Sequence, residues 1–551
     1  MLNYFNYISK KRATLNWLEK VLLTIFIVTC FLTLFGKTQM LSEIEAISKW
    51  HLFAFSFSLA TCLLSIYKIN NPLSKINQKT VIYYISIIIT DFSCILALHG
   101  LLQAMEVVPC SRYFIITGTF ENPVGLVASL CASIPFIVYS IRKAKFLPLK
   151  YSNISILLIV VICISISGSR TAILTMGVIG IIIIHQLRKI RFSKKSIILF
   201  ATGLIILTGG LYFLRKDSAD GRLLVWKCSW DMFMDKPFAG HGIGGFQANY
   251  MNYQAIYSEN HPDSKYSRLS DNVNYPFNEY LGLLINYGLV GCLIVFSVFL
   301  VLWNLCKWNR CDETQTATLC LTSIGLLALF SYPLSYIFIW CMLLLSISII
   351  LFFANNTITL QVLRWKKLLY SLGVVLSTVI LLYSGTKLFV QYSWGQVAKA
   401  SLKEQTASTF AKYKDLFPLL KDNKYFLYNY AVELNYGKRY KESIQIAQLC
   451  EKLWADYNLQ LLLGDNYNQL KRYKEAEKHI MLAANMCPTR FIPLYELFKI
   501  YKNTNNKEKS IRMAKTILKK PIKINSLQVQ YIIADIKLYL YIEGMKFYGS
   551  N

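Results

Sequence analysis

The pattern of apolar and polar positions divides the chain into two parts near residue 386. Before this point, runs of about twenty apolar residues alternate with short basic loops, and a helix of that length spans the roughly 30 Å hydrocarbon core of a bilayer. We therefore predict an all-α fold, with a polytopic membrane domain over 1–385 and a helical domain over 386–551. The eleven candidate spans are 21–36, 50–67, 81–102, 123–141, 153–168, 171–187, 196–214, 284–305, 315–331, 334–353 and 368–386.

Basic residues mark alternate loops and predict the orientation of the spans. Lys and Arg cluster within 10–20, 68–79, 142–150, 188–195, 307–310 and 364–367. The positive-inside rule assigns these loops to the cytoplasm, together with the N-terminus. An odd number of spans then places the long loop 215–283 and the domain 386–551 on the outer face. The short loops 168–170 and 331–333 fall on the same face and are predicted to line a site.

Charge and cysteine content narrow the class of protein further. Charged residues make up about 12% of residues 1–385 and about 25% of residues 386–551, so lipid solvates the first part and water the second. The net charge is +29, but the basic residues of the first part lie at the ends of apolar runs, a placement that sets orientation and does not indicate a nucleic-acid partner. Most of the fourteen cysteines lie in apolar runs and are typical of small buried residues. Whether Cys450 and Cys487, in the outer domain, form a disulfide stays open.

The domain 386–551 contains an internal repeat. The segments Arg439–Ser443, Arg472–Ala476 and Asn506–Ser510 follow one another at offsets of 33 and 34 residues. Each ends in a small residue and is preceded by an apolar helix, so the array resembles tetratricopeptide repeats, which stack into a solenoid with a concave binding surface. We interpret this domain either as a surface for an acceptor or envelope-assembly partner or as a packing platform.

Two features invite a chemical interpretation on their own. Asp91 lies in the middle of the third predicted span, where a charged group is costly and indicates either function or a hydrogen-bonding partner within the bundle. The glycine run 240–245 resembles a phosphate loop in composition only. No strand precedes it, no Gly-Lys-Ser/Thr follows it, and it falls outside the cytoplasm, so we reject nucleotide binding.

Six segments on the predicted outer face carry a family resemblance when taken in order: 118–123, 167–172, 221–226, 237–246, 277–281 and 287–291. Together they resemble the O-antigen ligase and polymerase superfamily of bacterial membrane glycosyltransferases over about residues 80–350. The resemblance implies transfer of a glycan from undecaprenyl diphosphate to an acceptor at the periplasmic face of the inner membrane. It implies neither a nucleotide sugar nor a required metal or other cofactor.

Arginine residues are the candidates for binding the diphosphate of the donor. Negative charge develops on the leaving diphosphate, and guanidinium is a planar, permanently charged fork that matches phosphate. Arg170 and Arg222 lie where the resemblance places such arginines. The alternatives are anchoring to lipid phosphates for Arg170 and a salt bridge for Arg222.

The residue that would accept the proton of the acceptor hydroxyl is not indicated by the resemblance. Many members of the superfamily have a histidine just before Asn278, whereas this chain has Phe277, which cannot accept a proton. The candidate bases are His261, Asp271 and Glu279, and His241 is a further candidate. Two residues, His241 and Asn278, are predicted to contact the substrate. Each could instead be structural, or the proton could leave late without a strong base.

The function predicted from these features is polymerisation or ligation of O-antigen, capsule or exopolysaccharide. Its partners would be membrane lipid, the lipid-linked glycan and a glycan, lipid or protein acceptor. Three alternatives remain: a protein O-oligosaccharyltransferase of the same superfamily, a transporter that moves the lipid-linked glycan without reacting with it, and a membrane-anchored scaffold.

Overall fold

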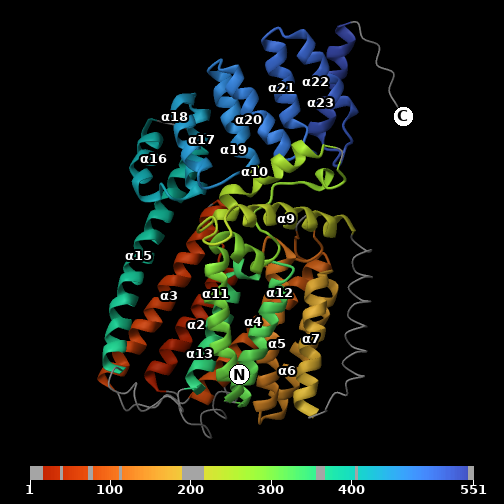
Figure 1. The fold of residues 1–551 in the computed structure, drawn as a ribbon. Coiled ribbons are helices and arrows are strands. Elements are labelled where there is room, and N and C mark those ends of the chain that lie inside the picture. Colours follow the sequence, from red (N-terminus) through yellow and green to blue (C-terminus); the bar gives the residue numbers. More distant parts are fainter. Residues whose placement is uncertain are drawn as a thin grey trace. The chain divides into compact units, whose positions relative to one another are not determined.

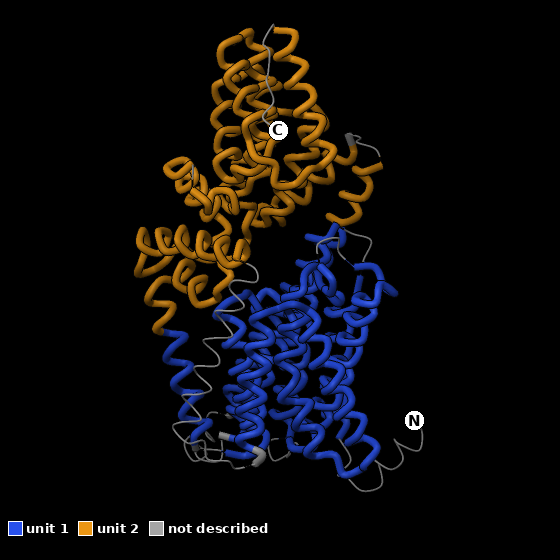
Figure 2. The backbone as a smooth tube through the Cα atoms, turned by 90° about the vertical axis from the view of Figure 1, so that its right-hand side faces the viewer, with its two compact units in different colours: residues 1–211, 294–393 blue, residues 212–293, 394–551 orange. Residues whose placement is uncertain are grey.

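The computed structural model describes residues 16–37, 41–71, 78–110, 114–188, 216–262, 264–308, 310–354, 366–403 and 407–543. Within these ranges the secondary structure is α-helical, with two short 3-10 helices and no β-strand (Figure 1). The chain divides into two compact units (Figure 2). Unit 1 comprises residues 1–211 and 294–393, and unit 2 comprises residues 212–293 and 394–551. The all-α prediction is therefore confirmed for the described residues.

Unit 1 is a bundle built around one buried helix, α5 (Pro123–Lys143). Its neighbours are α4 (Gln78–Ala104), α6 (Leu147–Ile166), α7 (Arg170–Arg188), α12 (Asp312–Ala328) and α13 (Ile337–Ala354). Small side chains let helices approach one another closely in a membrane, and α5 has a run of them: Ala128, Ser129, Cys131, Ala132 and Ser133. The unit also contains α2 (Trp17–Phe35), α3 (Ser42–Asn70), the 3-10 helix η2 (Pro333–Ser335), the second half of α11 (Glu279–Trp308) and most of α15 (Lys366–Ser401).

Apolar helices long enough to cross a membrane account for most of the predicted spans. Seven of the described helices qualify by length and composition: α2, α3, α4, α5, α6, α11 (Glu279–Trp308) and α15 (Lys366–Ser401). The apolar parts of α7 and α13 are shorter. The predicted span 315–331 overlaps α12, which is not among these apolar helices, and the predicted span 196–214 lies outside the described residues. The polytopic membrane class is confirmed, and the number of eleven spans stays a prediction.

One end of unit 1 is held by a cluster of charged side chains. Asp312, at the start of α12, accepts from Arg142 at 2.8 Å and from Lys143 at 2.7 Å. The buried carboxylate of Glu313 accepts a hydrogen bond of 2.9 Å from the hydroxyl of Tyr139. These contacts join α5 to α12. Arg142 and Lys143, which predict the orientation of the spans, therefore also stabilise the packing of two central helices.

Asp91 lies on a face of α4 that is exposed in the described part of the chain. Ile95 and Leu98 are exposed on the same face. The side chain therefore points away from the buried centre of the bundle, which argues against the hydrogen-bonding partner inside it that was one of the two interpretations from the sequence.

Unit 2 consists of the long loop and the C-terminal helices. The loop contains α9 (Lys216–Asp235), α10 (Gly245–Asn260) and the 3-10 helix η1 (Ser267–Leu269). The C-terminal helices pack largely in chain order. They are α16 (Ala407–Leu420), α17 (Lys424–Tyr436), α18 (Tyr440–Glu451), α19 (Tyr457–Gln469), α20 (Tyr473–Met486), α21 (Ile492–Asn503), α22 (Lys507–Lys519) and α23 (Leu527–Ile542).

A left-handed turn recurs with the period found in the sequence. Lys438, Lys471 and Asn505 have positive φ angles of 59°, 57° and 56°. The residue after each donates its backbone N–H to the carbonyl five positions earlier, at 2.8 to 2.9 Å, which is the bond that defines a Schellman ending. The small residues Ser443, Ala476 and Ser510 are buried. The helices thus repeat structurally, while their assignment to the tetratricopeptide family stays a prediction.

All fourteen cysteines lie in the described residues and are free thiols. Cys450 is buried, and its Sγ donates to the carbonyl of Lys424 at 3.2 Å. Cys487 is buried in a different cluster, where α20 meets α10. The question that the sequence left open is answered, because these two residues do not form a disulfide.

The repeated turn leads to a stability prediction. Lys471 holds a left-handed conformation, which costs an L-residue about 1 kcal/mol or more and costs glycine nothing. We expect Lys471→Gly to leave stability unchanged or raise it by up to about 1 kcal/mol. Lys478→Gly, at an exposed position within α20, should lower it by about 1 kcal/mol. The midpoint of thermal unfolding of the purified protein tests both, and equal destabilisation by the two changes would contradict the left-handed turn.

Candidate active site

The long loop is folded onto the repeat helices and is not a separate element. Apolar residues of α9 and α10 form one core with residues of α19 and α20. The shared members from the loop are Leu224, Val225, Cys228, Met232, Phe246, Tyr250, Met251, Ala255 and Tyr257, and those from the repeats are Ala455, Tyr457, Ala483, Met486 and Cys487. From its position in the chain, this loop is predicted to belong to the membrane domain 1–385, whereas the compact units group it with the C-terminal helices.

One buried glutamine joins three segments of this core. The Nε2 of Gln254 donates to the carbonyl of Asp271 at 2.9 Å and to the carbonyl of Met486 at 2.7 Å. Its Oε1 accepts from the hydroxyl of Tyr250 at 2.8 Å. Because Gln254 is buried, every one of these bonds replaces a bond to water that folding removes.

Charged side chains reinforce the attachment at its edge. The Oδ1 of Asp271 lies 2.7 Å from a guanidinium nitrogen of Arg490, and this bond raises the pKa of the arginine. Asn272 donates to the carboxylate of Asp456 at 2.6 Å. Lys424 donates to the side chain of Gln247, and burial lowers the pKa of Lys424 to about 8. Asp271, a candidate base, is thus engaged with the repeats.

Arg222 lies against the residue that replaces the family histidine. Its guanidinium carbon is 5.5 Å from the centroid of the Phe277 ring, within the range of a cation–π contact. One turn further along α9, the indole N–H of Trp226 donates to the carbonyl of Pro276 at 2.9 Å. Phe277 has a φ of 54°, which is uncommon for an aromatic residue and turns the chain into α11. Phe277 therefore provides a π surface for the arginine.

The start of α11 carries two further predicted residues. The Oδ1 of Asn278 accepts from the backbone N–H of Leu281 at 3.0 Å, so Asn278 caps the helix. Glu279 occupies the first turn of α11, where the helix dipole favours a carboxylate. The structure thus brings Arg222 together with the motif 277–279.

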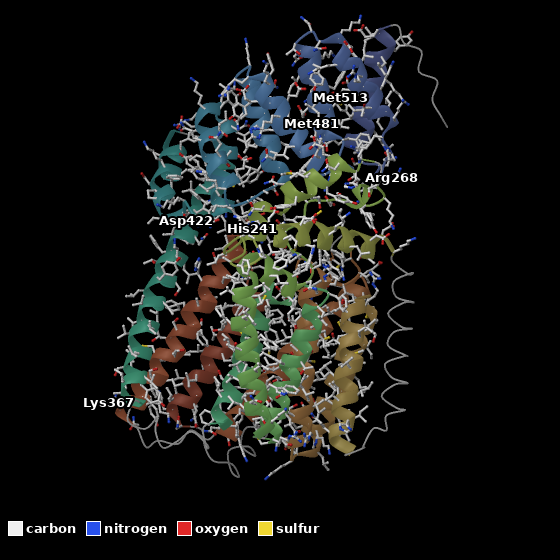
Figure 3. All side chains as sticks on the ribbon, in the orientation of Figure 1. His241, Arg268, Lys367, Asp422, Met481 and Met513 are labelled. Atoms are coloured by element: carbon white, nitrogen blue, oxygen red, sulfur yellow. The ribbon has the colours of Figure 1, made fainter. Side chains whose placement is uncertain are left out.

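The two histidines have separate structural contacts. Figure 3 labels His241 among the side chains of the loop. Its Nε2 lies 2.7 Å from the carbonyl oxygen of Met232, and because that oxygen only accepts, Nε2 donates the proton. His261 follows the last residue of α10, where its ring stacks on Tyr257 with centroids 4.6 Å apart. Its Nδ1 lies 3.1 Å from the carbonyl of Tyr257 and donates to it.

Arg170 belongs to unit 1, where it is the first residue of α7. The tight turn predicted at 168–170 is present, with Gly168 at a φ of 67°. The Oγ of Ser169 accepts from the N–H of Ala172 at 3.4 Å, as an N-terminal cap does. A guanidinium at a helix N-terminus combines a full charge with the positive end of the helix dipole, and both favour an anion.

Two short segments of unit 1 that the sequence singled out meet through Asn122. Its Oδ1 accepts from the hydroxyl of Tyr336 at 2.9 Å, and its Nδ2 donates to the hydroxyl of Tyr332 at 3.2 Å. Gln103 holds the same region, because its Oε1 accepts from the backbone N–H of Thr117 and of Gly118. Neither Gln103 nor Tyr336 is among the site residues predicted from the sequence. Two signals in the sequence could have indicated these residues. Gln103 is a polar residue in an apolar run, and Tyr336 follows Tyr332 by four residues.

Part of the chain matches a known protein family. Residues 155–296 are similar to a family described as O-Antigen ligase. The matched segment begins in α6 and ends within α11, so it contains Arg170, Arg222 and the motif 277–279. No curated protein matches the chain.

Residues 155–296 are thus similar to O-antigen ligases, and the apolar helices among the described residues indicate a multi-pass membrane protein. The match ends before the C-terminal helices begin, so it says nothing of the repeats. In the described part of the chain, no group of three or more His, Cys, Asp or Glu side chains forms a candidate metal site.

The attachment of this O-antigen ligase-like loop to the repeats can be tested at Gln254. Gln254→Ala leaves the buried carbonyls of Asp271 and Met486 without their donor, which we expect to cost about 1–3 kcal/mol for each group left without a partner. Gln528→Ala, at an exposed position on α23, should change stability by less than about 0.5 kcal/mol. Thermal unfolding and the rate of proteolysis within 216–293 measure the effect, and equal behaviour of the two variants would contradict it.

Proposed function

We propose that the protein transfers a glycan from a lipid-linked diphosphate donor to the hydroxyl of an acceptor, in the ligation or polymerisation of a surface polysaccharide. The observation that carries the proposal is that the O-antigen ligase match contains both candidate arginines and the motif 277–279, which Arg222 contacts. The donor we propose is a glycan on undecaprenyl diphosphate, and the site lies at the periplasmic face of the inner membrane, with the N-terminus in the cytoplasm.

Arg170 and Arg222 bind the diphosphate in this proposal. Arg170 adds its charge to the N-terminus of α7, and Arg222 is half-buried with its guanidinium held on the Phe277 ring. A partly desolvated guanidinium interacts with a phosphate more strongly than one in bulk water. The two groups stabilise the negative charge that develops as the diphosphate leaves.

Glu279 accepts the proton of the acceptor hydroxyl. The hydroxyl oxygen forms a bond to the anomeric carbon of the glycan, and the bond from that carbon to the diphosphate oxygen breaks. The diphosphate leaves with the electron pair, and the proton moves to the Glu279 carboxylate. We choose Glu279 because it belongs to the motif 277–279, which the O-antigen ligase match contains and Arg222 contacts at Phe277, whereas Asp271 is bound to Arg490.

The donor site predicts the effect of removing each guanidinium. Arg170→Ala and Arg222→Ala should each lower glycan transfer at least about 100-fold, while Arg268→Ala, at an exposed position of the same loop as Arg222, should keep it. The assay is complementation of a deletion strain, with glycans resolved by length on a gel and the membrane level of each variant measured by immunoblot.

The same gel separates the subtypes of the proposed reaction. Single-repeat glycan in place of a ladder would identify a polymerase, and a ladder retained on the lipid would identify a ligase. Changed glycoproteins with unchanged polysaccharide would identify a protein glycosyltransferase. Full activity of both arginine variants would contradict the mechanism.

The proton acceptor is tested by comparing two candidate bases. Glu279→Gln removes the basic carboxylate at nearly constant size and should lower transfer about 100-fold to 10,000-fold. His261→Ala, at an exposed position that follows α10, should keep most of the activity. Loss of activity in the His261 variant with full activity in the Glu279 variant would move the role of the base to His261.

A further inference from the structure

One face of α9 exposes apolar side chains. Leu223, Trp230 and Met234 follow one another at spacings of seven and four residues, which places them on one side of the helix. Trp230 is 52% exposed and Met234 is 58% exposed. The opposite side of α9 supplies Val225 and Met232 to the core shared with α10.

The turn after α9 continues this exposed apolar surface. Phe238 is 71% exposed and Ile243 is 91% exposed. We call Leu223, Trp230, Met234, Phe238 and Ile243 the apolar patch. Five large apolar side chains exposed this close together along the chain are unusual on a water-facing surface and are typical of a site that binds another apolar surface.

Two backbone hydrogen bonds join the turn after α9 to α11 next to Gly288. The N–H of Leu289 donates to the carbonyl of Pro237 at 2.8 Å, and the N–H of Val290 donates to the carbonyl of Phe238 at 3.2 Å. Gly288 makes this approach possible, because a Cβ there would lie 2.2 Å from the carbonyl oxygen of Phe238. Its φ of 61° and ψ of −163° interrupt α11 at the same place.

After Gly288, α11 continues as an apolar helix long enough to cross a membrane. Its sequence has no charged residue between Glu279 and Lys307, and its most apolar stretch is not buried within the chain. The exposed side chains of Leu293 and Val298 therefore face lipid. The turn that carries Phe238 is bonded to α11 where the helix enters the bilayer.

We propose that the apolar patch binds the membrane surface, with its side chains inserted into the leaflet that α11 enters after Gly288. The continuity of the patch with the point where α11 enters lipid identifies the bilayer as its partner. Tryptophan and phenylalanine suit the interfacial region, where an apolar ring meets polar headgroups. Lys227, on the same face of α9, suits the lipid phosphates.

This contact sets the depth of a proposed catalytic group. Arg222 precedes Leu223 on α9, so insertion of the patch holds Arg222 at the level of the headgroups. The diphosphate of a lipid-linked donor lies at that level. This consequence rests on the proposed function, whereas the lipid contact itself does not.

Photocrosslinking of the full-length protein in lipid nanodiscs tests the contact. The photoreactive residue p-benzoylphenylalanine replaces Phe238 or Ile243 in separate variants, and the nanodiscs contain phosphatidylethanolamine and phosphatidylglycerol. Val298, in the apolar part of α11, is the positive control, and Leu527, 84% exposed on α23, is the negative control. Mass spectrometry should find lipid adducts at 238, 243 and 298 and none at 527.

Two results would overturn the proposal: lipid adducts at 298 without any at 238 or 243, or adducts to protein at 238 and 243. Trp230 provides a third position for the photoreactive residue if one variant fails to fold. The double change Phe238→Ser and Ile243→Ser should also abolish any lipid adduct formed from position 230, while Leu527→Ser should not. Lipid adducts at the patch together with full activity of Arg222→Ala would leave the membrane contact standing and reject the proposed role of Arg222.

Discussion

The docking of α10 onto α19 and α20 is the interaction on which unit 2 depends. It buries the apolar side of the long loop. It also holds the chain segment 271–278 in place, because Gln254 donates to the carbonyl of Asp271 and Asn272 donates to Asp456. Arg222 and Phe277 face each other only because α9 and the start of α11 are both held in this core. The repeats are therefore part of the architecture that shapes the candidate site, and a free concave surface is not needed to explain their presence.

The features that could be predicted from the sequence are those with a local physical signal. A span is apolar on every side, whether lipid or other helices surround it, so α5 and α11 are recognisable from their own residues. The period of the C-terminal helices is equally local, because each turn at Lys438, Lys471 and Asn505 repeats the same backbone geometry. The attachment of the loop to the repeats has no such signal, since Gln254 and Met486 are 232 residues apart and neither is unusual in its own segment.

The features of the candidate site also divide into those that follow from adjacent residues and those that depend on distant ones. The tight turn before Arg170 and the position of Asn278 before a helix follow from adjacent residues and their caps. The partners of Asp271 and His241 do not, because Arg490 and the carbonyl of Met232 approach them only in the folded unit. A sequence can identify a histidine or carboxylate as chemically able to act as a base, whereas its hydrogen bonds decide whether it is available to do so.

The long-range bond from Gln254 to Met486 also has a consequence for biosynthesis. At about 5–20 residues per second, the ribosome needs roughly 10–50 seconds to make the 232 residues that separate these two positions. Throughout this interval the apolar side of α10 lacks its partners from α20, although its own segment has already been synthesised. The nascent loop therefore passes through a period of exposure that a chaperone or the membrane surface must cover, and shortening the chain before α20 would make that period permanent.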